Sequence, residues 1–162
     1  MSRRRAFVLG LLVVVVAWFA LPPLLRGPVS PEDQVRAAIV AVADGAGEPD
    51  IVATLAPVSR QYRDPQGADF TMVRGLLFRE FHARGPISTT LGPIEVDLGE
   101  DGITAEARFV CLLMDGIDLT SFDIRANSAD AWHFTVQLRV EDGDWMIHSH
   151  TRRAVEPQDV FR

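Results

Sequence analysis

An uncharged apolar segment near the N-terminus is the strongest constraint on how this chain folds. Residues 6–25 contain no charged side chain over 20 positions, and a helix of that length spans about 30 Å, the thickness of a bilayer core. Arg3, Arg4 and Arg5 precede the segment, so the positive-inside rule keeps the N-terminus in the cytoplasm. We therefore expect a single-pass protein of the bacterial inner (cytoplasmic) membrane, with its remaining residues on the extracytoplasmic, or periplasmic, side.

The residues after this segment decide whether it stays attached. The sequence LPPLLRGPVSPED contains no A-x-A-like cleavage site, which favours an uncleaved signal anchor over a removed signal peptide. Two alternatives stay open: cleavage, and export by the twin-arginine route, because two arginines begin the stretch RRAFVL. We expect a basic stub and anchor (1–26), a linker (27–30), a domain (31–155) and a C-terminal tail (156–162).

After the anchor, the chain is strongly acidic. From Gly27 onward it carries 12 arginines and 22 acidic residues, a net charge of −10. Nucleic-acid binding requires a basic surface, so we expect no nucleic-acid partner. Cys111 is the only cysteine, which excludes an intrachain disulfide. Its apolar neighbours predict a small buried side chain rather than a reactive thiolate.

Three helices are predicted in the first half of the domain. The sequence SPED at 30–33 provides an N-cap, a proline at the first helical position and acids in the first turn. This helix is expected to end at Gly45, and a shorter one follows at about 49–55. A third helix is expected at about 70–82, where helical spacing predicts an apolar face made of Val73, Leu76, Leu77 and Phe81.

In the second half of the domain the apolar period changes to two, which is typical of strands. A first hairpin turning at Asp101-Gly102 is predicted to pair Leu98 with Ala105, Val96 with Ala107, Ile94 with Phe109 and Glu95 with Arg108. A second hairpin, 131–140 and 145–155, is expected to turn at 141–144 and to place Val140 opposite Trp145. The sequence therefore predicts an α+β domain in which three helices pack on a curved antiparallel sheet.

The expected register of the second hairpin separates an apolar face from a polar one. His148 and His150 share the polar face in that register, where Gln137 and Thr135 lie across from them and His133 lies opposite Arg152. Such a group fits a small polar or anionic molecule, with arginines as charge partners. The predicted binding residues are His133, Thr135, Gln137, Arg139, His148, His150 and Arg152. The alternative, a solvated outer face of the sheet, stays open.

No metal site and no cofactor are expected. The strand histidines lack a carboxylate or cysteine at a convincing ligand spacing. The sequence also contains no nucleophile elbow, P-loop, dinucleotide fingerprint or HExxH motif.

The order of these elements resembles the nuclear transport factor 2-like superfamily, which includes SnoaL-like polyketide cyclases and ketosteroid isomerases. Two segments carry the resemblance locally: YRDPQG at 62–67 and DGDWMIHSH at 142–150. The resemblance covers about 31–155. It implies a cone of helices and bent sheet whose mouth can hold a small ligand, and dimerisation through the sheet. The same fold serves as a non-catalytic extracytoplasmic domain in anchored bacterial proteins, so the fold alone does not select a function.

Two functions follow as hypotheses. The leading one is an anchored binding or interaction module without catalysis, which binds a small ligand or serves as an accessory of an envelope complex. The alternative is an isomerase, cyclase or dehydratase in which Asp64 is the general base and Tyr62 or His148 orients the substrate. That alternative requires Asp64 and His148 to share one enclosed cavity. Both Asp64 and Tyr62 also have simpler interpretations, in which Asp64 shapes a turn before Pro65 and Tyr62 covers the core.

Overall fold

The computed structural model describes residues 29–84, 87–115 and 129–155. Those from Pro31 onward belong to one compact unit. The predicted anchor at 6–25, the tail at 156–162 and most of the segment between the two hairpins lie outside the described residues. Within the described ranges, no helix combines the length and the apolar character needed to cross a membrane. The elements run in the order α2 (Pro31–Gly47), α3 (Ile51–Leu55), α4 (Phe70–Arg84), β1 (Ile87–Leu91), β2 (Glu95–Leu98), β3 (Thr104–Asp115), β4 (Ala129–Glu141) and β5 (Asp144–Ala154).

The first two helices form close to their predicted positions, although α2 continues two residues beyond Gly45, to Gly47. α2 begins at Pro31, carries two acids in its first turn and buries Val35 and Ile39 against the sheet. α3 begins at Ile51, two residues later than expected, because the Asp50 side chain caps it by accepting bonds from the next turn's backbone N–H groups. The two helices meet at Gly45, where an added Cβ would lie 2.4 Å from the Thr54 backbone nitrogen.

The third helix, α4, spans the predicted residues and continues two positions further. Val73 and Leu77 lie on its inner side, and Phe81 is buried. The prediction for Leu76 was wrong, because this side chain is 45% exposed. One position along a helix is a rotation of about 100°, so Leu76 lies at the margin of the inner face that Leu77 occupies.

All the strands pair antiparallel in one sheet, in the order β1-β3-β4-β5, with β2 also paired to β3. The predicted pairs Val96–Ala107, Leu98–Ala105 and Glu95–Arg108 are confirmed. Ile94 precedes β2 and is not part of the ladder. The sequence prediction missed β1, which pairs with the far half of β3, so that two short strands follow one another along this long one.

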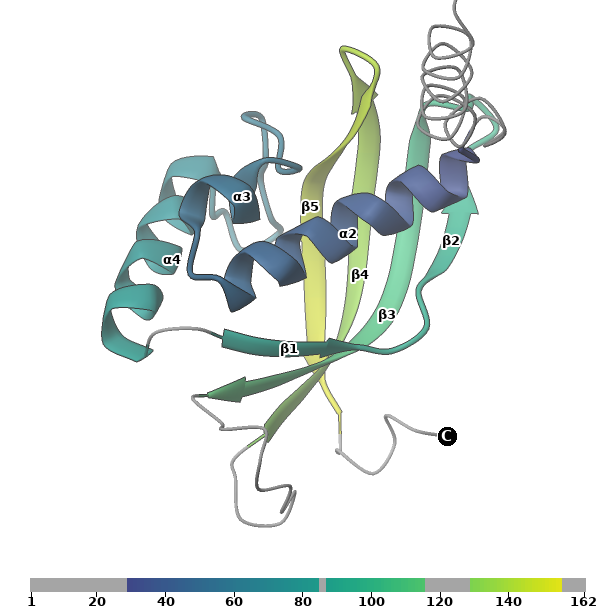
Figure 1. Cartoon of the computed structure of the whole chain (residues 1–162). Coiled ribbons are helices and arrows are strands. Elements are labelled where there is room, and N and C mark those ends of the chain that lie inside the picture. The colour runs from purple at the N-terminus through teal and green to yellow at the C-terminus, as the bar shows by residue number, and fades with distance from the viewer. Residues whose placement is uncertain (1–28, 85–86, 116–128, 156–162) are drawn as a thin grey trace, which may run out of the picture. The chain divides into compact units, whose positions relative to one another are not determined.

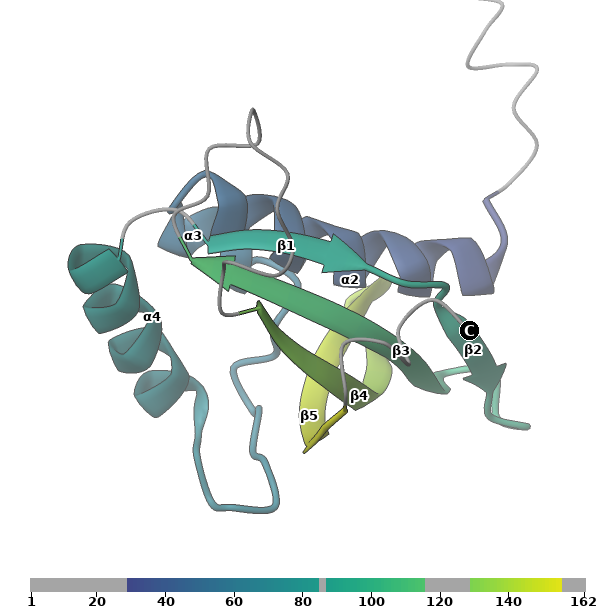
Figure 2. The same cartoon turned by 90° about the horizontal axis from the view of Figure 1, so that it is seen from below.

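The three helices lie on one face of a curled, half-barrel sheet, which gives the domain the form of a cone. Figure 1 shows α2 lying across one face of β3, β4 and β5, with α3 and α4 beside its C-terminal end. In Figures 1 and 2, β1 runs in a clearly different direction from β5, as expected for a strongly bent sheet. The core between the layers contains apolar side chains from both, including Val35, Ile39, Leu55, Ala107, Leu138 and Trp145.

The β4–β5 hairpin contains a bulge that the sequence did not reveal. Near the turn its register is as predicted, with Val140 opposite Trp145. Further along, Leu138 pairs with Ile147 but Gln137 pairs with Ser149, which leaves His148 as an extra, unpaired residue. An extra residue reverses the alternation of side chains beyond it.

The predicted polar face is therefore corrected beyond the bulge. His150 pairs with Val136 rather than with Thr135, and His133 pairs with Arg153 rather than with Arg152. Arg152 pairs with Phe134, and its guanidinium lies 4.7 Å from the centre of the Trp132 ring. The residues predicted to share one face thus divide between the two faces of the sheet.

Candidate functional site

A cavity of about 310 Å³ lies between the helices and the inner face of the sheet. Its walls are mainly apolar and come from every layer, with Ile39 and Val42 from α2, Val73 and Leu77 from α4, and Phe109 and Val136 from the strands. Among the described residues, the polar side chains of Thr54, Tyr62, Thr89 and His150 also line it. A concave, mainly apolar space with a few polar groups is the usual form of a small-molecule site.

Tyr62 and His150 form a hydrogen-bonded pair at the wall of this cavity. The Tyr62 hydroxyl lies 2.5 Å from His150 Nδ1, and the His150 ring also packs against Phe134 with 5.7 Å between ring centres. Burial raises the pKa of Tyr62 to about 12, and the nearby negative charge of Asp64 adds to this rise. Burial also lowers the pKa of His150, reinforced by Arg152 and opposed by Asp64. Both groups are therefore neutral at pH 7.

Two neutral groups share this one hydrogen bond, and each carries one exchangeable proton. Among the residues that the structure describes, His150 Nδ1 is the hydrogen-bond partner of the Tyr62 hydroxyl, and the imidazole tautomer decides which of the two donates. When the phenol donates to Nδ1, the imidazole proton lies on Nε2; when Nδ1–H donates, the phenol keeps its own proton for another partner. In either tautomer the pair retains one donor for a further partner.

Tyr62 reaches the cavity because residues 57–63 run beside β5. The Ile147 N–H donates to the Pro57 carbonyl at 2.8 Å, and the Ser59 N–H donates to the Ile147 carbonyl at 2.9 Å. Arg63 N–H continues the contact by donating to the His148 carbonyl at 2.9 Å. With this backbone held at the sheet edge, the Tyr62 side chain is directed inward and is only 4% exposed.

Asp64 has a structural task in the turn that follows. Its Oδ1 atom accepts the Ala68 N–H at 2.7 Å, and its backbone N–H donates to the Ala68 carbonyl at 3.0 Å. The residues lining the cavity within the described part of the chain do not include Asp64. Its charge nevertheless acts on both members of the Tyr62–His150 pair.

His148 lies at the bulge and does not line the cavity either, as far as the described residues go. Its Nε2 atom is buried and makes no hydrogen bond of normal geometry within the described residues. It lies 2.6 Å from Glu141 Oε1, a contact that is an ion pair when the imidazole is protonated. The same carboxylate oxygen accepts the Ser59 hydroxyl at 2.8 Å. Sequence reasoning identified neither Ser59 nor Glu141. Ser59 is completely buried, but a single serine in a loop gives no periodic signal in the sequence.

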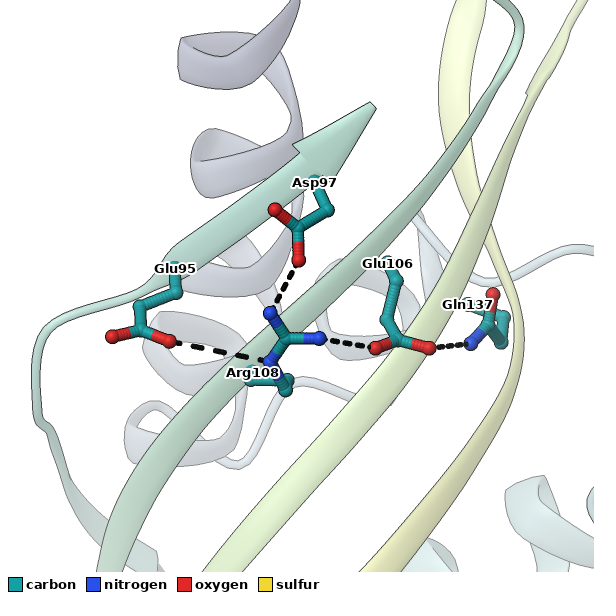
Figure 3. A network of polar contacts seen from close by, with 5 residues as sticks. All are labelled: Glu95, Asp97, Glu106, Arg108 and Gln137. Atoms are coloured by element: carbon teal, nitrogen blue, oxygen red, sulfur yellow. Dashed lines mark hydrogen bonds and ion pairs between the residues drawn. The ribbon is translucent and has the colours of Figure 1, made fainter. Parts of the chain in front are cut away.

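Thr135, Gln137 and Arg139 alternate with the inward residues of β4 and lie on the outer face of the sheet. There Gln137 Nε2 donates to Glu106 Oε2 at 2.6 Å. Arg108 connects the same Glu106 to the carboxylates of Asp97 and Glu95, as Figure 3 shows. This outer polar network is separated from the cavity by the sheet itself.

Cys111 is buried as predicted and contributes to the cavity wall. Burial raises the pKa of its thiol to about 11, so the thiolate form is suppressed at pH 7. In the described ranges, no three side chains of histidine, cysteine, aspartate or glutamate gather closely enough to hold a metal ion.

No protein-family model matches this sequence, and no curated protein matches it significantly. Solved structures with the same architecture do match. An NTF2-like protein with a cystatin-like fold from Novosphingobium aromaticivorans has a TM-score of 0.60 at 16% identity, over 81% of this chain and 88% of that one. A ketosteroid isomerase-like protein from Erwinia carotovora atroseptica has a TM-score of 0.56 at 16% identity, over 76% of this chain and 95% of that one.

A third match extends the likeness to a larger protein. Bd1075 of Bdellovibrio bacteriovorus has a TM-score of 0.63 at 7% identity, over 76% of this chain. The matched region is 40% of Bd1075, so this chain spans less than half of that protein's length. At these identities the likeness defines the fold alone. The domain has the nuclear transport factor 2-like, or cystatin-like, α+β fold.

Proposed function

We propose that residues 31–155 form a binding domain for a small, mainly apolar molecule that carries one hydrogen-bond-accepting oxygen. The observation that supports this most directly is the cavity of about 310 Å³, whose apolar walls are interrupted by the Tyr62–His150 pair. Pockets that bind small molecules have volumes of about 300–1,000 Å³, which places this cavity at the small end of the range.

The other polar groups of the cavity support a single polar contact. The Thr54 hydroxyl donates to the Asp50 carbonyl at 2.7 Å, and the Thr89 hydroxyl donates to the Ile87 carbonyl at 3.3 Å. Their protons are therefore already used by the backbone. When the phenol of Tyr62 donates to Nδ1, His150 Nε2 carries the N–H whose bond a ligand oxygen can accept.

A charged ligand suits these walls poorly. No arginine or lysine is among the described residues that line the cavity, and transfer of an unpaired charge into apolar surroundings is strongly unfavourable. The proposal therefore replaces the polar or anionic ligand that the sequence suggested with a neutral one. Arg139, predicted as a charge partner, lies on the outer face of β4.

A matched pair of compounds tests this proposal. 1-Tetralone is a small bicyclic ketone, and tetralin is its counterpart without the oxygen. Calorimetry on the full-length chain in lipid nanodiscs should show binding of both compounds, with 1-tetralone about fivefold tighter, since one net hydrogen bond contributes about 1 kcal/mol. His150→Phe should remove the preference and keep tetralin binding. Failure of the wild-type chain to bind either compound would contradict the proposal.

A second candidate function is enolisation of such a ketone, as in the isomerase, cyclase or dehydratase hypothesis. The charge of Asp64 acts on both Tyr62 and His150, and this is the observation that favours Asp64 as a general base. Against it, the described residues that line the cavity include neither Asp64 nor His148, so the shared cavity that this hypothesis requires is not found among them. The test follows deuterium incorporation next to the carbonyl of 1-tetralone in D2O by NMR. Catalysed exchange that Asp64→Asn abolishes and Asp144→Asn retains would establish catalysis, whereas exchange at the uncatalysed rate would leave binding alone.

We further propose that residues 6–25 tether the domain to the extracytoplasmic side of a bacterial inner membrane. The support is the uncharged apolar segment and the arginines that precede it. The full chain should resist alkaline carbonate extraction. A reporter enzyme active only outside the cytoplasm should be active when fused after residue 162 and inactive when fused before residue 6.

The exposed outer face of the sheet is the surface that we propose for a homodimer or an envelope protein partner. Its support is the resemblance to sheet-paired dimers. Because this face carries charged side chains such as Arg108 and Glu106, the contact would be a polar one. Native mass spectrometry of the full chain released from nanodiscs measures its oligomeric state. A monomer at all concentrations would rule out the homodimer.

A further inference from the structure

The inward direction of His150 depends on the bulge at His148. Ile147 is buried on the inner side of β5. In a regular strand, residues two apart share a face, so Ser149 would follow Ile147 inward and His150 would point outward. Because His148 is the extra residue, His150 pairs with Val136 and lines the cavity. Whatever stabilises the bulge therefore also places the imidazole.

Backbone bonds hold the residue before the bulge and the bulge residue itself, but they do not by themselves explain the position of the bulge. Ile147 exchanges bonds with Pro57 and Ser59, and the carbonyl of His148 accepts the Arg63 N–H. The segment that makes these bonds, residues 57–63, has no regular strand partner on its other side among the described residues. Its register against β5 needs a side-chain anchor.

One carboxylate oxygen provides that anchor. Glu141 Oε1 accepts the Ser59 hydroxyl at 2.8 Å and lies 2.6 Å from His148 Nε2. The Ser59 hydroxyl oxygen in turn accepts the Gln61 N–H at 3.0 Å. A single side chain at the end of β4 thus connects the loop segment to the bulge residue, in a region where Ser59 is completely buried.

We propose that Glu141 is a positioning residue for the ligand site, which acts through Ser59 and His148 to hold the bulge and keep His150 directed into the cavity. None of these three residues lines the cavity in the described part of the chain. The proposal deepens the proposed function and rests on it only for the ligand. The placement of His150 is testable without any ligand.

Histidine NMR provides the direct test. The full-length chain contains 4 histidines, so selective ¹³C labelling in nanodiscs gives a simple spectrum. In the wild-type chain, His150 should titrate below its ordinary value because it is buried. In Glu141→Ala, its midpoint should rise toward about 6.5 as the ring becomes solvated, and the roughly fivefold preference for 1-tetralone over tetralin should fall to about onefold.

Two further variants separate positioning from general stability. Asp144→Ala removes an exposed carboxylate from the same turn, where Asp144 pairs with Glu141. It should change neither the His150 titration midpoint nor the preference for 1-tetralone over tetralin. Glu141→Gln keeps an oxygen acceptor for Ser59, so it should restore most of the wild-type titration. If Glu141→Ala does not fold, Ser59→Ala replaces it and should shift His150 in the same direction.

The results that would overturn the proposal differ from those that would overturn the proposed function. A folded Glu141→Ala, or Ser59→Ala in its place, with unchanged His150 titration would show that Glu141 does not position the ring. Wild-type protein that binds neither compound would refute ligand binding, while the His150 titration would still decide the role of Glu141.

Discussion

Polar side chains find their hydrogen-bond partners differently on the two faces of the sheet. On the outer face, Arg108 is surrounded by three carboxylates and Gln137 is bonded to one of them, so polar groups satisfy one another beside solvent. On the inner side, Tyr62 and His150 pair within apolar walls and retain one hydrogen-bond donor for a further partner. An incomplete polar pair in a buried space is the better indicator of a ligand.

The largest difference in stability is expected between truncations of two neighbouring residues that lie on opposite faces of β4. Leu138 is 2% exposed, and Leu138→Ala should lower the free energy of unfolding by about 2–5 kcal/mol. Gln137→Ala loses one exposed bond and should cost less than about 1 kcal/mol. Urea denaturation of both variants measures the difference, and equal losses would contradict the assignment of the faces.

A smaller effect should distinguish the inner and outer sides of α2. An added Cβ at Gly45 would lie 2.4 Å from the Thr54 nitrogen, whereas at Gly47 nothing lies within 4 Å. Gly45→Ala should therefore destabilise the domain by about 1–3 kcal/mol through overpacking. Gly47→Ala should be neutral or slightly stabilising, because alanine restricts the unfolded chain. Thermal unfolding compares the two; a stable Gly45→Ala would show that α2 and α3 are less closely packed.

The inner face should also change how the chain responds to alkali. Tyr62 is the only tyrosine, so absorbance near 295 nm reports it alone. Burial raises the pKa of Tyr62 to about 12, whereas its pKa in the unfolded chain is about 10. The stabilisation that protonated Tyr62 provides is therefore complete below about pH 10 and is lost as the pH rises through 12. The native chain should titrate near pH 12, and Gln137→Ala on the outer face should leave that midpoint unchanged. A native midpoint near 10 would place Tyr62 in solvent.

In acid, His150 should provide a related signal of smaller size. Burial lowers the pKa of His150 in the native state, so the unfolded chain binds this proton more readily. The free energy of unfolding should therefore fall as the pH drops below about 6.5, the pKa of an unfolded histidine, toward the lower native pKa. His150→Gln should lose this part of the pH dependence, whereas His133→Gln on β4 should retain it. Denaturation at a series of pH values measures both, and identical curves for the two variants would argue against a buried His150.

The smallest effect should be found at the outer polar network. Arg108→Ala leaves Glu95, Asp97 and Glu106 close together without their shared cation. Because these groups lie in solvent, the loss of stability should be slight, and added salt should remove most of it by screening the repulsion. Melting temperatures at low and high salt test this. A loss that salt does not reduce would indicate a structural role for Arg108 beyond charge.

The sequence predicted much of this fold because its strongest signals are local. The start of α2 follows from the sequence SPED at 30–33. The pairs Val96–Ala107 and Val140–Trp145 were predicted correctly because apolar alternation and the position of each turn define the register. The first turn is longer than the predicted two-residue turn, since the Gly102 N–H donates to the Gly99 carbonyl and the Gly99 N–H to the Thr104 carbonyl. The β1 strand was missed because ISTTL lacks a clear alternation of polar and apolar residues. Its pairing depends on the distant half of β3.

The site was harder to predict because one inserted residue decides it. His148 and His150 are two apart, which in a regular strand gives them the same face, and the bulge that separates them has no sequence signal of its own. Its support comes from Ser59 and Glu141, which are 82 positions apart in the sequence. Sequence patterns detect repeating neighbours, whereas this arrangement depends on one long-range contact.

The placement of residues 57–63 beside β5 also affects how the domain avoids aggregation. The edge of a sheet can add a strand from another molecule. In β5, the half nearest the turn is covered by this segment through Pro57, Ser59 and Arg63. The other half, which no described strand covers, contains Arg152 and Arg153, and charged side chains discourage strand addition. One edge is thus protected by a loop in its first half and by charge in its second.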